Sequence, residues 1–120
     1  MKSLIRLKLG NYDRALELIN EAIKINPQCA RNYVQRARIL IKLNKFDMAI
    51  KDCDESISIN PDYGVAYKFR GRAKQLLGRL EEAYYDYGQS CNIDYNEEVD
   101  EWMKEIKDDV IKIQASHPHK

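Results

Sequence analysis

The sequence predicts an all-α fold made of three consecutive helix-turn-helix units followed by one further helix. The first observation behind this prediction is a period of 34 residues in the small and aliphatic positions: Ala15, Ala49 and Ala83, and likewise Ile25, Ile59 and Ile93. The second is that the turn-forming residues Gly10, Asn44 and Gly78 keep the same interval. The third is that Asn26-Pro27 recurs as Asn60-Pro61 where a unit ends. A fixed period of this length indicates an array of stacked repeats.

Within each unit the apolar residues follow a helical rather than an alternating spacing. We expect first helices over about 1–9, 30–43 and 64–77, and second helices over about 12–25, 46–59 and 80–93. Gly10, Asn44 and Gly78 lie between the two helices of a unit, because residues that tolerate a left-handed backbone end helices readily. The units therefore span 1–29, 30–63 and 64–95. The first unit is truncated, since Tyr33 and Tyr67 place the matching aromatic residue before Met1, and we expect the chain to be part of a longer protein.

After Tyr95 the period stops, and residues 96–115 predict a capping helix with an apolar stripe: Val99, Trp102, Met103, Ile106, Val110 and Ile113. Such a stripe would cover the exposed end of the last repeat, so we assign Trp102 to packing. Glu97 and Glu98 in the first turn complement the helix dipole. Residues 116–120, which include Pro118, are expected to form a disordered tail.

The composition describes an ordinary helical domain: 120 residues, 44% hydrophobic and 32% charged. No apolar run approaches the roughly 18 residues that a membrane span needs, and no secretory signal is visible, so a cytoplasmic location is expected. Three cysteines, an odd number without close pairs, suggest neither a disulfide framework nor a zinc site. The repeats hold no Ser-His-acid set and no phosphate-binding glycine loop, so we expect neither an enzyme nor a cofactor.

Charge is divided sharply between the two sets of helices. Residues 1–12, 30–43 and 64–77 contain eleven basic residues and no acidic ones: Lys2, Arg6, Lys8, Arg31, Arg36, Arg38, Lys42, Lys68, Arg70, Arg72 and Lys74. Residues 13–25, 47–59 and 81–94 invert this, with eleven acidic residues against three basic ones. A nucleic-acid partner is disfavoured, because the net charge is only +1 and phosphate-binding domains are usually strongly basic.

The 34-residue period with small residues at fixed positions resembles the tetratricopeptide repeat. The resemblance implies a right-handed superhelix whose first helices line a concave groove. We expect this groove to bind an acidic partner through these candidate residues: Arg31, Gln35, Arg38, Lys42, Lys68, Phe69 and Arg72. Val34, Val65, Leu4, Leu7 and Lys8 continue the same strip. A positive concave surface focuses its field and speeds the association of an acidic partner. The alternative is that these bases pair with acids on neighbouring helices.

Four stretches are similar to the repeat region of the Hip family of co-chaperones: Ala49-Ile50-Lys51-Asp52-Cys53-Asp54, Tyr67-Lys68-Phe69-Arg70-Gly71-Arg72-Ala73, Leu76-Leu77-Gly78 and Cys91-Asn92-Ile93-Asp94-Tyr95-Asn96-Glu97. The resemblance implies that the domain binds the nucleotide-binding domain of the heat shock protein 70 (Hsp70) chaperone in its ADP state and slows nucleotide release. The dimerisation and client-binding parts of that family are not in this sequence, so we expect a monomer.

A second chaperone-binding mode, that of Hop-like repeats, holds the acidic C-terminal tail of the chaperone in a carboxylate clamp. In the register of this chain the clamp needs asparagine at positions 4 and 35, lysine at 65 and arginine at 69, whereas the chain has Leu4, Gln35, Val65 and Phe69. Each lost hydrogen bond to a charged group is worth about 1.5–3 kcal/mol, so tail binding is disfavoured. The remaining alternative is a general assembly scaffold that holds an acidic peptide of another partner.

Overall fold

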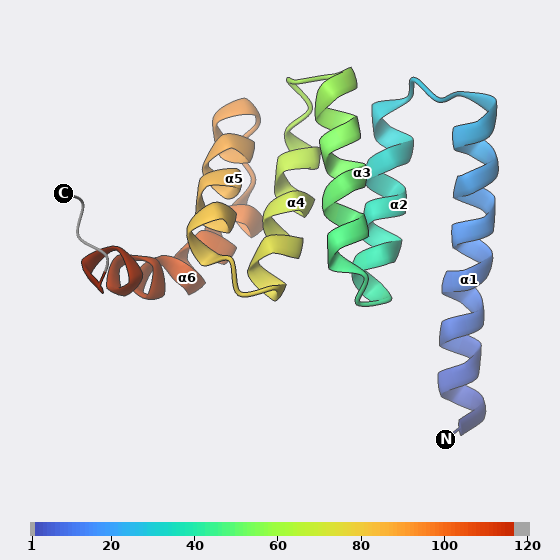
Figure 1. Cartoon of the computed structure of the whole chain (residues 1–120), viewed down its shortest axis with the longest axis horizontal. Helices are drawn as coiled ribbons and strands as arrows, with labels where there is room; N and C mark the ends of the chain where they lie inside the picture. Colours follow the sequence, from blue (N-terminus) through green and yellow to red (C-terminus); the bar gives the residue numbers. More distant parts are fainter. Residues whose placement is uncertain (1, 117–120) are drawn as a thin grey trace.

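Six helices make up the computed structural model, which describes the backbone of residues 2–116 and the side chains of residues 11–116. They are α1 (Lys2–Ile25), α2 (Ala30–Lys42), α3 (Phe46–Ile59), α4 (Gly64–Leu76), α5 (Leu80–Ile93) and α6 (Glu97–Ser116). No strand occurs within residues 2–116. Helices α1 to α5 stand side by side in chain order, and α6 runs across the end of the row (Figure 1). Each helix packs against the next, and α2 also contacts α4, which brings the first helices of two repeats together.

The turns inside the second and third repeats form as the periodic residues predict. Asn44 and Gly78 take the left-handed backbone conformation, with φ of 61° and 82°. The next backbone N–H in each case reaches back to a carbonyl in the last turn of the helix, from Lys45 to Leu40 at 2.8 Å and from Arg79 to Lys74 at 2.9 Å. These bonds satisfy carbonyls that a helix end otherwise leaves unpaired. Helices α2 and α4 therefore stop within one residue of their predicted ends.

The first repeat does not form the predicted helix-turn-helix unit, and the expected break at Gly10 is wrong. Helix α1 runs without interruption from Lys2 to Ile25. A glycine inside a helix costs only about 1 kcal/mol relative to alanine, so Gly10 permits a turn without enforcing one. The straight α1 leaves one flank without a neighbouring helix, and its small residues Ala15 and Ala22 are only half-buried. The side chains of Leu4, Leu7 and Lys8 lie outside the described residues.

Small residues bring the helices of the later repeats together. Ala37, Ala49 and Ala83 are completely buried. Gly71 makes the closest approach, since a Cβ atom placed there would lie 2.7 Å from the ring of Tyr87. That ring is itself fully buried, so α4 and α5 can pack this closely only because position 71 has no side chain.

Helix α6 covers the end of the array, as its apolar stripe predicts. Val99, Ile106 and Val110 are buried in a cluster with Ala83 and Tyr87, and α6 packs on α5. The helix ends at Ser116, which was expected in the disordered tail, and residues 117–120 lie outside the described residues. In the part of the chain that the structure describes, no helix has the length and apolar character to cross a bilayer.

Candidate functional site: a basic hollow on aromatic side chains

Helices α2, α4 and α6 enclose a hollow of about 280 Å³, here called the α2–α4–α6 hollow. Its lining residues come from all three helices: Arg38, Ile41 and Lys42, then Lys68, Phe69 and Arg72, then Glu98 and Trp102. The hollow thus combines four basic side chains with two aromatic rings and a single acid. Such a lining suits an acidic side chain that carries an apolar neighbour.

The basic side chains of the hollow lie against the aromatic rings. The Cζ atom of Arg38 is 5.0 Å from the centroid of the Phe69 ring, and that of Arg72 is 4.7 Å from Trp102. Lys68 lies between the two rings, with its Nζ atom 5.3 Å from Phe69 and 5.4 Å from Trp102. Cations are attracted to aromatic faces at these distances. The rings therefore hold three long side chains in place and keep their charges at the hollow.

Glu98 contributes the acidic group of the hollow. Its Oε1 atom lies 2.6 Å from Nζ of Lys68. The hydrogen bond from Lys68 lowers the pKa of the Glu98 carboxyl, partial burial opposes this, and the positive charges of Lys68, Arg72 and Arg38 lower it further. The free domain thus already holds one carboxylate at the centre of its basic hollow.

The structure brings five of the seven predicted groove residues together: Arg38, Lys42, Lys68, Phe69 and Arg72. Gln35 lies beside them and accepts a 3.4 Å hydrogen bond from Arg38. Arg31 is exposed in the first turn of α2 and does not line the hollow. Val34, predicted on the same strip, is only 1% exposed, so it belongs to the core and cannot contact a partner.

Sequence reasoning missed Glu98 and Trp102 as lining residues. Trp102 does pack as predicted, with its ring centroid 5.7 Å from that of Tyr87, but it also borders the hollow. The available signal was the spacing of four residues between Glu98 and Trp102, which places both on one face of α6. The sequence assigned Trp102 to the apolar stripe and Glu98 to the helix dipole, so neither was predicted to line the groove.

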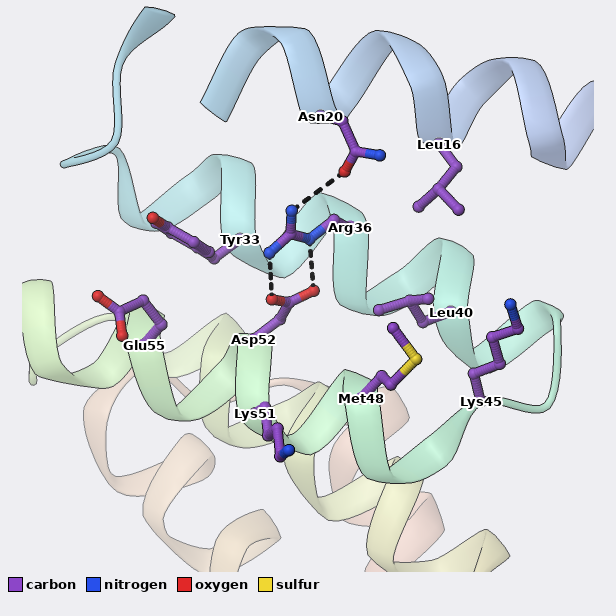
Figure 2. Close-up of a pocket in the computed structure, with 10 residues that line it drawn as sticks. All are labelled: Leu16, Asn20, Tyr33, Arg36, Leu40, Lys45, Met48, Lys51, Asp52 and Glu55. Carbon is purple, nitrogen blue, oxygen red and sulfur yellow. Dashed lines mark hydrogen bonds and ion pairs between the residues drawn. The ribbon is translucent and has the colours of Figure 1, made fainter. Parts of the chain in front are cut away.

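The other bases of the first helices have a structural role. Two residues along a helix differ by about 200°, so Arg36 and Arg70 point away from the face that Arg38 and Arg72 share. Arg36 donates two hydrogen bonds to Asp52, at 2.8 and 2.7 Å, and one to Asn20 at 3.0 Å. Figure 2 shows this guanidinium between α1 and α3. It lies in a pocket of about 660 Å³, where Leu16, Leu40 and Met48 supply apolar side chains.

The same arrangement recurs one repeat later, 34 residues along the chain. Arg70 donates to Asp86 at 3.0 and 2.9 Å and to Asp54 at 2.8 Å. Lys74 lies 3.1 Å from Asp86. Burial disfavours the charged form of Arg70, yet its hydrogen bonds to Asp86 and Asp54 outweigh this and raise its pKa. These contacts join three helices, so they stabilise the stacking of repeats.

The bases of the first helices therefore divide into two groups, those that pair with acids and those that do not. Among residues 11–116, four bases of the first helices pair with acids: Arg36, Lys68, Arg70 and Lys74. The ion pairs found among the same residues do not include Arg31, Arg38, Lys42 or Arg72. Of the five candidate groove bases, Lys68 is the one that pairs with an acid among residues 11–116, so the alternative of pairing with neighbouring helices holds for Lys68. Arg38, Lys42 and Arg72 line the hollow without an ion pair among these residues.

Comparisons with known proteins agree with this architecture. The tetratricopeptide repeat family model matches residues 1–29 and residues 30–63. No match is found among curated proteins.

Solved structures are similar over most of the chain. The first tetratricopeptide repeat (TPR) domain of Spaghetti (RPAP3), bound to the HSP90 peptide SRMEEVD, is 29% identical to this chain with a TM-score of 0.81. The match covers 92% of this chain and 88% of that chain. The first TPR domain of human RPAP3 is 28% identical with a TM-score of 0.83, covering 96% and 91%. The second TPR domain of human RPAP3, in complex with the HSP70 peptide SGPTIEEVD, is 30% identical with a TM-score of 0.75, covering 84% and 85%. From its repeats, its helical array and these relatives, the chain belongs to the tetratricopeptide repeat family.

Proposed function

We propose that this domain is a co-chaperone module that binds the nucleotide-binding domain of an Hsp70 chaperone in its ADP state through the α2–α4–α6 hollow. The observation that carries the proposal is the set of Arg38, Lys42 and Arg72, which line the hollow and make no ion pair among the described residues. Charges held at a concave site attract an acidic surface and speed its association. The resemblance to the Hip family and the chaperone peptides bound by the RPAP3 domains support a chaperone as the partner.

The positions of the carboxylate clamp favour a folded acidic surface over the chaperone tail. Where the clamp needs lysine, Val65 is 37% exposed and offers no hydrogen-bond donor. Where it needs arginine, Phe69 carries Arg38 and Lys68 on its ring. A terminal carboxylate at these two positions would lose its water without gaining the charged partners of the clamp. Two other functions are distinguished from the proposal by the test below: binding of the chaperone tail, and a scaffold role with an acidic peptide of another partner.

The first test is calorimetric titration of the domain with an isolated Hsp70 nucleotide-binding domain plus ADP, and separately with a peptide ending in Glu-Glu-Val-Asp. Binding to the nucleotide-binding domain, with much weaker binding to the peptide, is the expected result. Binding to the peptide alone would replace the proposal with tail recognition. Binding to neither would leave the scaffold role as the better explanation.

Charge reversal then tests the hollow itself. The double variant Arg38→Glu and Arg72→Glu should slow association at low salt by on the order of tenfold or more, and added salt should shrink the difference. The matched control reverses Lys24 and Lys51, which are exposed and lie outside the hollow. Circular dichroism must first establish that both variants fold. Equal association rates for the two double variants would remove the hollow from the mechanism.

A further inference from the structure

We infer that Glu98 acts as an internal ligand of the α2–α4–α6 hollow, occupying in the free domain a carboxylate site that an acidic side chain of the partner takes over on binding. The inference rests on the proposed use of the hollow for an acidic partner. It adds a specific exchange of one carboxylate for another at Lys68.

The carboxylate site is built around Lys68. This side chain is only 15% exposed and is confined between the rings of Phe69 and Trp102, so its ammonium group has few other positions to adopt. Arg38 lies against the ring of Phe69 and Arg72 against the ring of Trp102. Both are close enough for their positive charges to lower the pKa of Glu98. Glu98 therefore pairs with Lys68 at a position where the positive charges of Arg38 and Arg72 also act on its carboxylate.

Glu98 differs from the structural acids because it can leave its position. Its side chain is 58% exposed, whereas that of Asp86, which pairs with Arg70 and Lys74, is fully buried. An ion pair this exposed contributes little to stability, so water can replace Lys68 at Glu98 at small cost. The backbone next to it stays in place, because Val99 is fully buried against α5. Only the Glu98 side chain has to move, while α6 remains packed.

The incoming group is defined by the rest of the lining. Ile41, Phe69 and Trp102 supply apolar surface beside the cations. A hollow of about 280 Å³ accepts one or two side chains rather than a long peptide. The ligand class is therefore an aspartate or glutamate with an adjacent apolar side chain. The same chemistry occurs on the surface of a folded domain and in a short peptide, and the experiment uses both sources.

The single tryptophan of the chain provides a direct readout, because Trp102 is in contact with Lys68 and Arg72. Its fluorescence is followed while the amidated pentapeptide acetyl-Leu-Glu-Leu-Asp-Leu is added to the 120-residue domain. The variant Glu98→Gln removes the internal carboxylate and keeps the shape of the side chain. The control Glu97→Gln removes the same charge from the same first turn of α6, but Glu97 does not line the hollow.

Glu98→Gln should strengthen peptide binding by about three- to fivefold, the upper part of the range expected when a competing exposed ion pair is removed, and Glu97→Gln by less than about 1.5-fold. In a Lys68→Gln background the gain from Glu98→Gln should vanish. An unchanged or weaker affinity of Glu98→Gln, an equal gain in Glu97→Gln, or no peptide binding by either protein would overturn the inference.

A second readout does not depend on affinity. Carbon NMR of the Glu98 carboxyl should give a lowered pKa in the free domain, and saturating peptide should move it back toward the ordinary glutamate value. A carboxyl pKa that the peptide leaves unchanged would mean that Glu98 keeps Lys68 when the ligand is bound, which also overturns the inference.

A parallel titration with the Hsp70 nucleotide-binding domain and ADP separates this inference from the proposed function. Binding of that domain without any effect of Glu98→Gln would retain the function and remove the internal ligand. The Glu98 effect with the peptide, without binding of the chaperone domain, would retain the internal ligand and remove the chaperone as its partner.

Discussion

The buried carboxylate of Asp86 should contribute more to the stability of the array than its counterparts elsewhere in the repeats. Its side chain is fully buried and pairs with two cations, Arg70 and Lys74, which are 18% and 12% exposed. Asp86→Asn keeps the shape but leaves both cations facing a neutral amide. Breaking a buried pair in this way costs about 3–5 kcal/mol. Arg70 keeps Asp54 and Lys74 keeps Glu82, so we expect a loss of about 3 kcal/mol, near the lower end.

Asp52, the periodic equivalent of Asp86, and Asp54, the second acid bound by Arg70, provide internal controls of the same chemistry at lower burial. Among residues 11–116 Asp52 pairs with Arg36 alone, and the two side chains are 9% and 27% exposed. Asp52→Asn should cost about 1.5–2 kcal/mol, near the lower end for hydrogen bonds to charged groups. Asp54 is 54% exposed, so Asp54→Asn should cost less than about 1 kcal/mol.

The assay is urea unfolding followed by circular dichroism, with the osmolyte trimethylamine N-oxide added to all proteins if Asp86→Asn is largely unfolded without it. The expected order of the losses is Asp86, then Asp52, then Asp54. A loss below about 1 kcal/mol for Asp86→Asn, or an equal loss for Asp52→Asn, would refute burial as the factor that sets these contributions.

Three further predictions follow from particular residues. Gly78→Ala should destabilise the domain by about 1–2 kcal/mol, because position 78 has a left-handed backbone. Gly10→Ala should stabilise the domain by up to about 1 kcal/mol, because position 10 is helical. Both are measured by urea unfolding, and a loss of stability in Gly10→Ala would indicate a turn at position 10. Cys53 is fully buried and burial raises its thiol pKa, so native-state titration with a disulfide reagent should modify the half-buried Cys29 and Cys91 and reach Cys53 only after unfolding. The folded-state pKa of Glu98 is lowered, so its pairing with Lys68 stabilises the fold above the ordinary pKa of 4.5, and this stabilisation is lost as the pH falls through the lowered value. In urea unfolding across this pH range, the free energy of unfolding should fall less on acidification in Glu98→Gln than in the unmodified domain. An identical pH profile of the two proteins would contradict the pairing.

The candidate site was predictable to the extent that helical periodicity assigns side chains to faces. Counting along the first helices identified Arg38, Lys42, Lys68, Phe69 and Arg72, and the structure places all five around one hollow. The same count could not separate the bases of the hollow from those that join the repeats. Arg36 and Arg70 differ from their neighbours only in having a buried acid on another helix within reach.

The sequence by itself determined the all-helical repeat architecture, because the small residues and the turn residues of the second and third repeats act through contacts that recur every 34 positions. It also determined the ends of α3 and α5 and the apolar stripe of α6, which depend on local backbone chemistry and on burial against the preceding helix. Only the tertiary structure decided two other features. Gly10 lies inside a continuous α1, because a permissive residue forms a turn only when the helices on both sides pack together. Glu98 reaches Lys68 because α6 crosses the end of the array, a contact between distant positions that no repeat period encodes.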